Sequence, residues 1–352
     1  MPQPLRMVYD IKQKVAKCFE AKDAFSRYTS DVIASAAYGV KFNSMNDKEN
    51  EFYSHGKTAL SFTFLSTIKF ELLTLFPRLM RLLGATFFPR RTDEFFKNII
   101  KGTVKIRKEQ GIVRQDMIHL LMLAMERRDG IEVTLDDIVG QAFFFFLAGF
   151  DTSSSLMCFI AHELAANLHI QERLYEEIEE QTREDGGKVT YDSLSKMKYL
   201  DMVASETLRK YPVAPFTNRV CTKDHVLPPP MEGYPECSVE RGMVLLLPIF
   251  GLHRDPKYFP KPDKFDPERF SDENRSKIEP YTYMPFGIGL RQCIGNRFAL
   301  MEAKIVIIDL VRKFVIKFTE KSRDPIIFGL SNFNLTAKDG FWLKLEERKK
   351  TN

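Results

Sequence analysis

A proline-free stretch from residue 134 to residue 167 limits most strongly what this chain can fold into. Its apolar residues follow helical spacing, and Thr134 and Asp137 stand where the two partners of a capping box would close the first turn. A helix of about 30 residues is about 45 Å long, which is enough to cross a whole domain. We therefore expect a mainly α-helical protein built around one long helix.

Shorter helical patterns flank this stretch, and several end at a glycine or a proline. After Pro212, short apolar runs such as 243–248 stand among prolines and glycines and indicate small strands and ordered coil. The segment 59–83 is apolar almost all round, which suits a buried helix or a lid over a pocket. We predict one domain, residues 1–352, mainly α with minor β. The other predicted helices are 8–19, 24–38, 171–182, 194–211 and 297–314, the last followed by a hairpin.

The composition argues against several classes of protein. The chain carries 52 Lys and Arg against 47 Asp and Glu, intermixed, so no dedicated nucleic-acid binder is expected. Its five cysteines are dispersed and form no C-x-x-C pair, which argues against a disulfide scaffold or a zinc ribbon and predicts reduced thiols. The longest uninterrupted apolar run, 142–150, is too short for a membrane span, and the first residues lack the apolar segment of a signal peptide.

Phenylalanine is unusually common, with 30 Phe against a single Trp. The rings gather in three segments, 62–76, 87–96 and 143–150. Two interpretations are open, an apolar ligand pocket and plain core packing. We favour core packing for most of these rings, because large aromatic side chains dominate the interiors of most folded domains.

The strongest chemical signal is the loop FGIGLRQCIG, residues 286–295, directly before a predicted helix. A thiolate facing an iron must be held rigidly and supported by backbone N–H donors, and the positive end of the following helix favours the anion. Gly289 and Gly295 would let the backbone approach the sulfur and a flat cofactor, and Arg291 can pair with an acidic group on it. The alternative is a glycine-rich turn with an incidental cysteine, but these fixed positions coincide by chance on the order of once in ten thousand such chains. Cys293 is the predicted metal ligand.

This loop resembles the haem-binding signature of the cytochrome P-450 superfamily, beginning at Phe286. Residues 148–152, Ala-Gly-Phe-Asp-Thr, are similar to the oxygen-activation motif in that family's long central helix, and Arg219 stands where the family places an arginine on a haem propionate. Residues 252–256 and 280–285 resemble the microsomal drug- and toxin-metabolising branch of animals, of insect type. The resemblance extends over essentially the whole chain.

The resemblance implies a haem-thiolate monooxygenase with haem b bound through Cys293. Asp151 and Thr152 would be the catalytic residues and would deliver protons for O–O cleavage. One oxygen atom of O₂ would enter an apolar small molecule, a xenobiotic or an endogenous lipid or hormone. Electrons would come from NADPH through cytochrome reductase, with cytochrome b5 as a further partner, on the cytoplasmic face of the endoplasmic reticulum membrane. The residues predicted to contact haem are Phe286, Gly289, Arg291, Cys293, Gly295 and Arg219.

Three weaker motifs have structural explanations. A Thr152 hydroxyl that bonds back to a carbonyl, three residues after Gly149, could open a local bulge in the helix. Glu206 and Arg209 alone would be read as a surface ion pair, but in the family such a pair is buried and joined to the arginine of the P-E-R-F element, here Arg269. These three are therefore predicted to be structural. No second histidine lies at metal-site spacing from His253, which favours a structural hydrogen bond or a haem-edge contact.

One element of the family has no counterpart. A Trp-x-x-x-Arg helix grips the haem propionates in the family, whereas the single tryptophan here is Trp342, near the end of the chain. The resemblance begins at residues 5–9, so we expect a P-450 fold that is N-terminally truncated and lacks its anchor and first helices. The alternative function is a catalytically inactive truncated product that binds haem poorly or acts through protein contacts.

Overall fold

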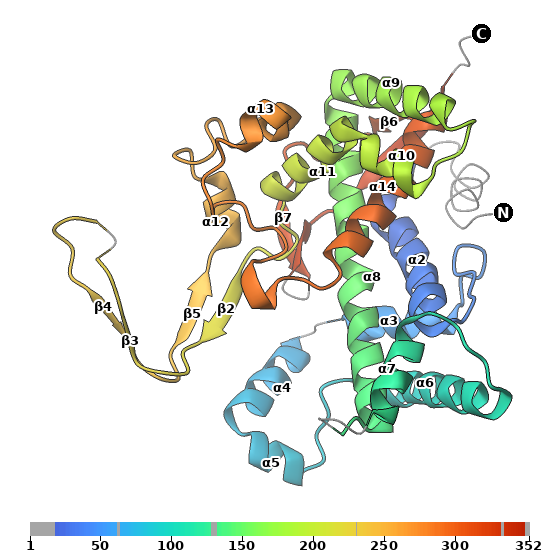
Figure 1. Ribbon diagram of the computed structural model, residues 1–352, viewed down its shortest axis with the longest axis vertical. Helices are drawn as coiled ribbons and strands as arrows, with labels where there is room; N and C mark the ends of the chain where they lie inside the picture. Colours follow the sequence, from blue (N-terminus) through green and yellow to red (C-terminus); the bar gives the residue numbers. More distant parts are fainter. Residues whose placement is uncertain (1–17, 62–63, 128–131, 230, 332–333, 349–352) are drawn as a thin grey trace.

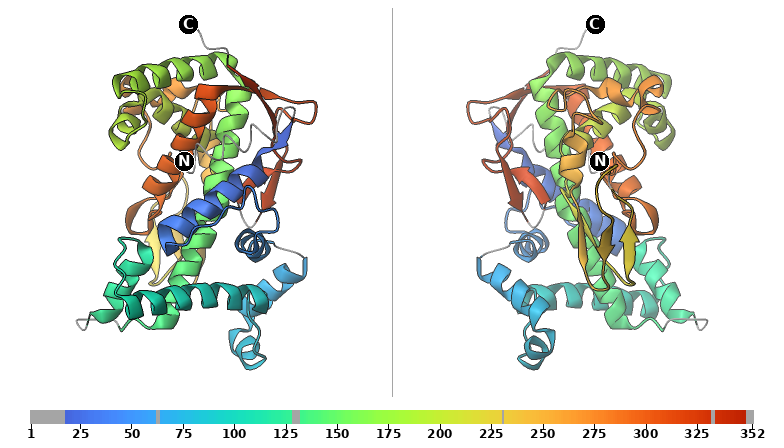
Figure 2. Two further views of the ribbon diagram at one scale, coloured as in Figure 1. Left: turned by 90° about the vertical axis from the view of Figure 1, so that its right-hand side faces the viewer. Right: turned by 90° about the vertical axis from the view of Figure 1, so that its left-hand side faces the viewer.

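The computed structural model of the chain describes residues 18–61, 64–127, 132–229, 231–331 and 334–348. One long helix, α8 (Leu135–Ala166), runs through the molecule, and helices gather at both of its ends (Figure 1). The side views show α2 crossing α8 obliquely (Figure 2). The remaining α-helices are α2 (Ala21–Ile33), α3 (Glu51–Ala59), α4 (Phe64–Leu75), α5 (Pro77–Leu82), α6 (Arg90–Gln110), α7 (Met117–Glu126), α9 (Leu168–Glu184), α10 (Tyr191–Lys196), α11 (Lys198–Lys210), α12 (Ile249–Arg254), α13 (Asp272–Arg275) and α14 (Asn296–Lys313). A π-helix, η1 (Ala34–Tyr38), continues α2, and η2 (Pro267–Phe270) and η3 (Gly289–Arg291) are short 3-10 helices.

The long helix forms where the sequence predicts it. The Thr134 side chain accepts from the Asp137 N–H, and the Asp137 carboxylate accepts from the Thr134 N–H, so the capping box is present. By length and composition, this 32-residue helix could also cross a membrane, although no uninterrupted apolar run suggested it. Since 67% of its most apolar window is buried inside the protein, α8 serves as the core helix.

Two apolar cores lie along α8. Around its first half, α3, α6 and α7 pack against α8, and α3 and α6 contribute aromatic rings to this contact. The ring centroids of Phe52 and Phe146 lie 4.9 Å apart, as do those of Phe96 and Phe146, so in this region the core-packing interpretation of the phenylalanines is confirmed. Around the second half of α8, the helices α2, α9, α11 and α14 form the larger core.

Two sequence-based expectations need correction. Segment 59–83 is not one buried helix: Pro77 occupies the first position of α5, and the chain bends there because proline cannot continue α4. Leu75, Phe76 and Leu82 are exposed rather than buried. The predicted helix 8–19 lies outside the described residues except at its end, where Phe19 belongs to a strand.

The strands are short and form four small sheets, which confirms the minor β content. A three-stranded sheet, in the order β1-β9-β6, joins the start of the described chain to its end, and the other strands form antiparallel pairs, β2 with β5, β3 with β4 and β7 with β8. The 243–248 run contains β5, as predicted. The strands are β1 (Phe19–Glu20), β2 (Thr217–Val220), β3 (His225–Leu227), β4 (Cys237–Val239), β5 (Val244–Leu247), β6 (Phe314–Phe318), β7 (Phe328–Ser331), β8 (Asn334–Ala337) and β9 (Trp342–Glu347).

Candidate functional site

The cysteine loop is held in shape by its own backbone. The Cys293 N–H donates to the Phe286 carbonyl at 2.8 Å, and the Gln292 N–H donates to the Gly289 carbonyl at 3.0 Å. Gly287 and Gly289 have φ of 71° and 69°, a region that disfavours any residue with a Cβ. The loop therefore closes from residue 286 to residue 293 by a direct hydrogen bond, and glycine is required at two of its positions.

The thiol stands at the surface, at the start of a helix. Cys293 is exposed, and α14 begins three residues later, at Asn296. Helix α14 packs against α8, so the loop is anchored to the central helix. The loop's apolar side chains Leu290 and Ile294 are exposed, whereas Phe286 packs against the larger core.

Packing inside the protein does not require glycine at position 295. Gly295 is the N-cap of α14 and has an ordinary φ of −91°. A Cβ placed there would lie 4.0 Å from Cys293 Sγ, which is a normal contact. No conflict inside this protein therefore demands glycine at this position. The predicted close approach of the backbone at Gly295 therefore matters only for a cofactor that binds against the loop.

The donor chemistry of this loop fits haem. Nowhere in the described part of the chain do three or more His, Cys, Asp or Glu side chains gather as a metal-binding group. Cys293 can thus supply a single sulfur ligand, which suits an iron whose in-plane ligands belong to a ring rather than to the protein. The exposed Leu290 and Ile294 offer apolar surface beside the thiol, and the exposed Arg291 offers a cation.

The second predicted propionate partner, Arg219, lies on β2 and is half-buried. One terminal guanidinium nitrogen, Nη1, donates to Thr217 Oγ1 at 3.1 Å and to the Asn218 carbonyl at 2.7 Å. Its residue partner on β5 is Leu245. The contacts of Arg219 are thus local ones within its own strand, which leave the role on haem a prediction.

The predicted oxygen-activation residues lie on two different faces of α8. Thr152 belongs to an exposed face together with Phe144 and Ala148, and its hydroxyl donates to the Ala148 carbonyl at 2.6 Å. Asp151 is buried and faces α2, where it forms an ion pair with Lys22. The predicted back-bond is therefore present, but the predicted bulge is not, because α8 is an uninterrupted α-helix through this region. A single back-bond bends a helix less than a lost backbone hydrogen bond does.

Gly149 has a packing role that the sequence did not reveal. A Cβ at this position would lie 2.6 Å from Ile33 Cδ1 at the end of α2, closer than side chains can approach. Glycine lets α2 and α8 cross in close contact. Glycine at this position therefore eases the packing of α2 on α8, because any larger residue would force the end of the Ile33 side chain to move.

A buried ion-pair network supports the chain before the cysteine loop. Glu206 and Arg209, both fully buried, make a bidentate pair at 2.7 and 2.9 Å. The Asp266 N–H donates to Glu206 at 2.9 Å, the Arg269 guanidinium lies 3.4 Å from Glu206, and Arg209 donates to the His253 carbonyl at 2.9 Å. The structure therefore brings together the three residues predicted as a structural network and links them to α12.

His253 makes a structural hydrogen bond. Its Nε2 accepts from the Met284 N–H at 2.9 Å, two residues before the cysteine loop. Burial lowers the pKa of His253 to about 4, which leaves the ring neutral and able to accept. The neighbouring Tyr283 donates to the Ser205 carbonyl at 3.0 Å. The segment that carries the loop is thereby tied to α11 and α12.

Two further groups could hardly be predicted from the sequence. Glu302, on α14, is buried with neither carboxyl oxygen hydrogen-bonded, and burial raises its pKa to about 8, with Ser153 of α8 as its polar neighbour. An acid on the apolar face of the predicted helix, beside Ala303 and Val306, was the available signal. The lysine paired with Asp151, Lys22, carried no signal, since it is far away in the sequence.

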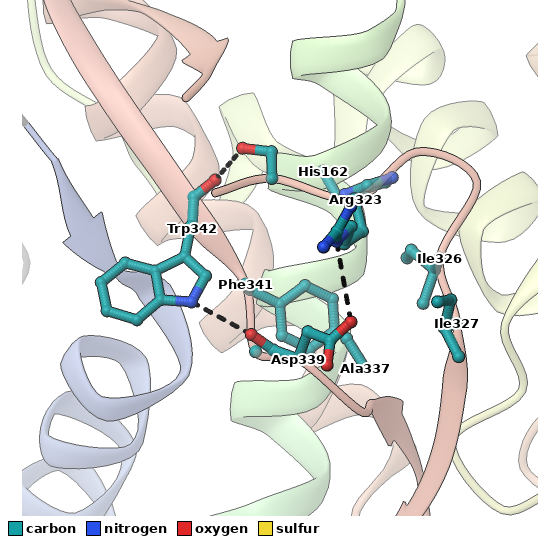
Figure 3. A pocket seen from close by; sticks show the side chains of 10 residues that line it. His162, Arg323, Ile326, Ile327, Ala337, Asp339, Phe341 and Trp342 are labelled. Atoms are coloured by element: carbon teal, nitrogen blue, oxygen red, sulfur yellow. Dashed lines mark hydrogen bonds and ion pairs between the residues drawn. The ribbon is translucent and has the colours of Figure 1, made fainter. Parts of the chain in front are cut away.

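A small pocket opens at the far end of α8 (Figure 3). His162, Arg323, Asp339 and Trp342 are among the residues that line it, and its volume of ≈ 10 Å³ has room for about one water molecule. His162 lies about 15 Å along the helix from Thr152. This pocket is therefore too small to hold a substrate, and it lies away from Thr152.

Comparison with known proteins shows the family to which the chain belongs. The chain matches the family described as Cytochrome P450 over residues 5–343. It is 46% identical over 343 residues to cytochrome P450 9e2 of Blattella germanica, and 45% identical over 338 residues to probable cytochrome P450 9f2 of Drosophila melanogaster. These matches cover 94% of this chain, which spans 64% and 65% of the two relatives' lengths. Probable cytochrome P450 6a14 of Drosophila melanogaster is 39% identical over 339 residues. The chain therefore belongs to the cytochrome P450 family.

Proposed function

We propose that this chain carries the haem-binding and oxygen-activating part of a monooxygenase that oxidises apolar small molecules. The observation that carries the proposal is the self-closed loop that presents Cys293 beside exposed apolar side chains, at the start of a helix packed on α8. Family membership supports the same reaction class. The proposed electron source is NADPH, through cytochrome reductase or cytochrome b5.

When bound, the haem would supply the oxygen-activating iron and the redox chemistry. Cys293 would bind the iron through its sulfur, while the loop backbone keeps the sulfur in a fixed position. Arg219 and Arg291 would neutralise propionates, and Leu290 and Ile294 would lie against the apolar ring. On the exposed face of α8, the Thr152 hydroxyl would orient a water that carries protons to the reaction. Apolar side chains on this exposed face of α8, such as Phe144, would exclude bulk water from the substrate.

The first prediction tests the sulfur ligand. The haem-loaded protein is expected to show the red-shifted Soret band of a thiolate ligand when reduced and exposed to carbon monoxide. Cys293→Ala should abolish that band, because alanine has no sulfur to bind the iron. Cys237→Ser is a matched control, since Cys237 is also exposed; the variants Cys18→Ser, Cys158→Ser and Cys221→Ser should likewise keep the band. A band that survives Cys293→Ala would remove Cys293 as the ligand. If the wild-type protein shows no such band, the alternative function, a catalytically inactive truncated product, is favoured.

The second prediction concerns Thr152. Thr152→Ala is expected to leave haem binding intact and to divert O₂ reduction towards hydrogen peroxide, because the hydroxyl that holds the proton-carrying water is lost. Thr152→Ser keeps a hydroxyl that can bond to the Ala148 carbonyl and should retain most of the yield. The measurement is product and peroxide formed per NADPH consumed. An unchanged product yield in Thr152→Ala would contradict the role.

A further inference from the structure

Three oxygen atoms at the C-terminal end of α9 are buried without a hydrogen-bond partner. They are Gln181 Oε1, Thr182 Oγ1 and Asp185 Oδ2, and no donor among the described residues reaches any of them. Thr182 is only 1% exposed. A buried polar atom without a partner is costly, so folded proteins satisfy such atoms with a protein group, a water molecule or an ion. The three oxygens therefore point to a bound group at the end of this helix.

The three side chains share one face of α9. Consecutive residues of an α-helix differ in direction by about 100°. Asp185 is the C-cap, and its φ of −90° and ψ of 20° keep it close to the helical path. It therefore lies about 40° from Gln181 and about 60° from Thr182 around the axis, within about one turn. From these positions the three oxygens can converge on one small space beside the helix end.

Backbone donors at this helix end are already used. The chain turns back over the end of α9, where the Gly186 N–H donates to the Arg183 carbonyl at 3.2 Å and the Gly187 N–H to the Thr182 carbonyl at 2.8 Å. Both glycines have positive φ, 66° and 86°, which this tight turn requires. The carbonyls keep a second lone pair, so the turn adds acceptors rather than donors to this place.

The electrostatics at this point favour a cation over a water molecule. The C-terminal end of a helix carries a partial negative charge of about half an elementary charge. Asp185 adds a carboxylate there, and Arg183, the basic residue of the last turn, is exposed on the opposite side of the helix. A water molecule would bridge the oxygens but leave this charge uncompensated. A cation would satisfy the oxygens and the charge together.

We propose that the end of α9 binds a hard metal cation through Gln181 Oε1, Thr182 Oγ1 and Asp185 Oδ2. Hard cations take oxygen ligands such as carboxylates and amide carbonyls. A single carboxylate favours a monovalent ion, Na⁺ or K⁺, because the affinity for Ca²⁺ depends on the number of charged ligands. The ion would fix the turn that joins α9 to α10 (Figure 1). This inference goes beyond the proposed monooxygenase function and does not depend on it.

The test is urea unfolding of the full chain in NaCl, KCl or CaCl₂, each titrated against choline chloride at constant ionic strength. The unfolding midpoint should rise to a plateau, because an ion that binds only the folded state stabilises it by mass action. At an ion concentration ten times the dissociation constant, the equilibrium constant for unfolding should be about elevenfold lower. The salt with the lowest half-saturating concentration identifies the ion. A midpoint that is the same in all four salts would overturn the inference.

Two variants remove single ligands, and a third serves as the matched control. Asp185→Asn removes the charge at nearly constant size and should abolish the ion-dependent shift, whereas Thr182→Val, similar in shape, should reduce it. Asp255 is also a half-buried C-cap, that of α12, but its Oδ1 accepts from the Lys257 N–H at 2.9 Å. Asp255→Asn should keep the full ion-dependent shift. An undiminished shift in Asp185→Asn would contradict the site.

Gln181→Glu gives a readout that does not rely on a loss of stability. A second carboxylate should lower the half-saturating concentration of CaCl₂ about tenfold and shift the preference towards this ion. An unchanged affinity would mean that the three oxygens do not converge. Broadening of the sodium NMR signal by the wild-type protein, but not by Asp185→Asn, would report binding directly. None of these measurements uses catalytic activity, so failure of the monooxygenase function and failure of the cation site are distinguishable.

Discussion

Glu206→Ala is expected to lower the free energy of unfolding by about 3–5 kcal/mol and to reduce haem retention with it. The substitution leaves the guanidinium of Arg209 fully buried without its carboxylate, and removes the acceptor of the Asp266 N–H. A loss of this size is a large part of a typical net stability of about 5–15 kcal/mol. The measurements are urea unfolding and the ratio of haem to protein after gel filtration.

Two variants separate the buried network from ion pairs in general. Glu206→Gln keeps a side-chain oxygen for Asp266 and should lose less stability than alanine does. Asp93→Ala breaks the i,i+4 pair with Lys97 on the surface of α6 and should cost about 0.5 kcal/mol or less. If Glu206→Ala and Asp93→Ala have equal effects, the network does not support the loop.

Glu302 is expected to make the protein less stable as the pH rises. The folded carboxyl has a pKa raised by burial to about 8, against 4.5 for an ordinary glutamate. Between pH 4.5 and pH 8 the folded state keeps the proton on Glu302, whereas the unfolded state has lost it. The contribution of Glu302 to the free energy of unfolding is therefore fully present below about pH 4.5, falls as the pH rises, and is lost above about pH 8. The full loss over this window is on the order of 5 kcal/mol.

The neutral variant Glu302→Gln removes this titration while keeping the shape of the side chain. Its advantage over the wild-type protein should be small at pH 4.5 and should grow to about 5 kcal/mol above pH 8. Urea unfolding at a series of pH values measures the difference. Glu346→Gln is the control, because Lys317 and Lys344 hold the pKa of that exposed carboxyl below 4.5, outside the window. Parallel curves for the wild-type protein and Glu302→Gln would contradict the buried, neutral state of Glu302.

Much of the helical framework was predictable because its signals are local. The capping box at Thr134, the stop at Pro212 and the 3.6-residue spacing depend on neighbours within one or two turns, and α8, α9, α11 and α14 form close to the predicted bounds. The failure at 59–83 has the opposite cause. The apolar composition of a segment does not predict which other elements pack on it, and no other described element buries Leu75 or Leu82.

The sequence by itself determined the chemistry of one loop. The identities and spacing of the residues from Phe286 to Gly295 predict a sulfur ligand, and a backbone hydrogen bond between residues seven positions apart shapes that loop. Only the tertiary structure decided the side-chain partners of Asp151 and the burial of Glu302. Lys22 and Asn334 lie 129 and 183 residues from Asp151 in the chain, and Glu302 meets Ser153 only where α14 packs on α8. Such contacts depend on how helices cross, and burial there sets the pKa of Glu302 and the partners of Asp151, so no local pattern encodes them.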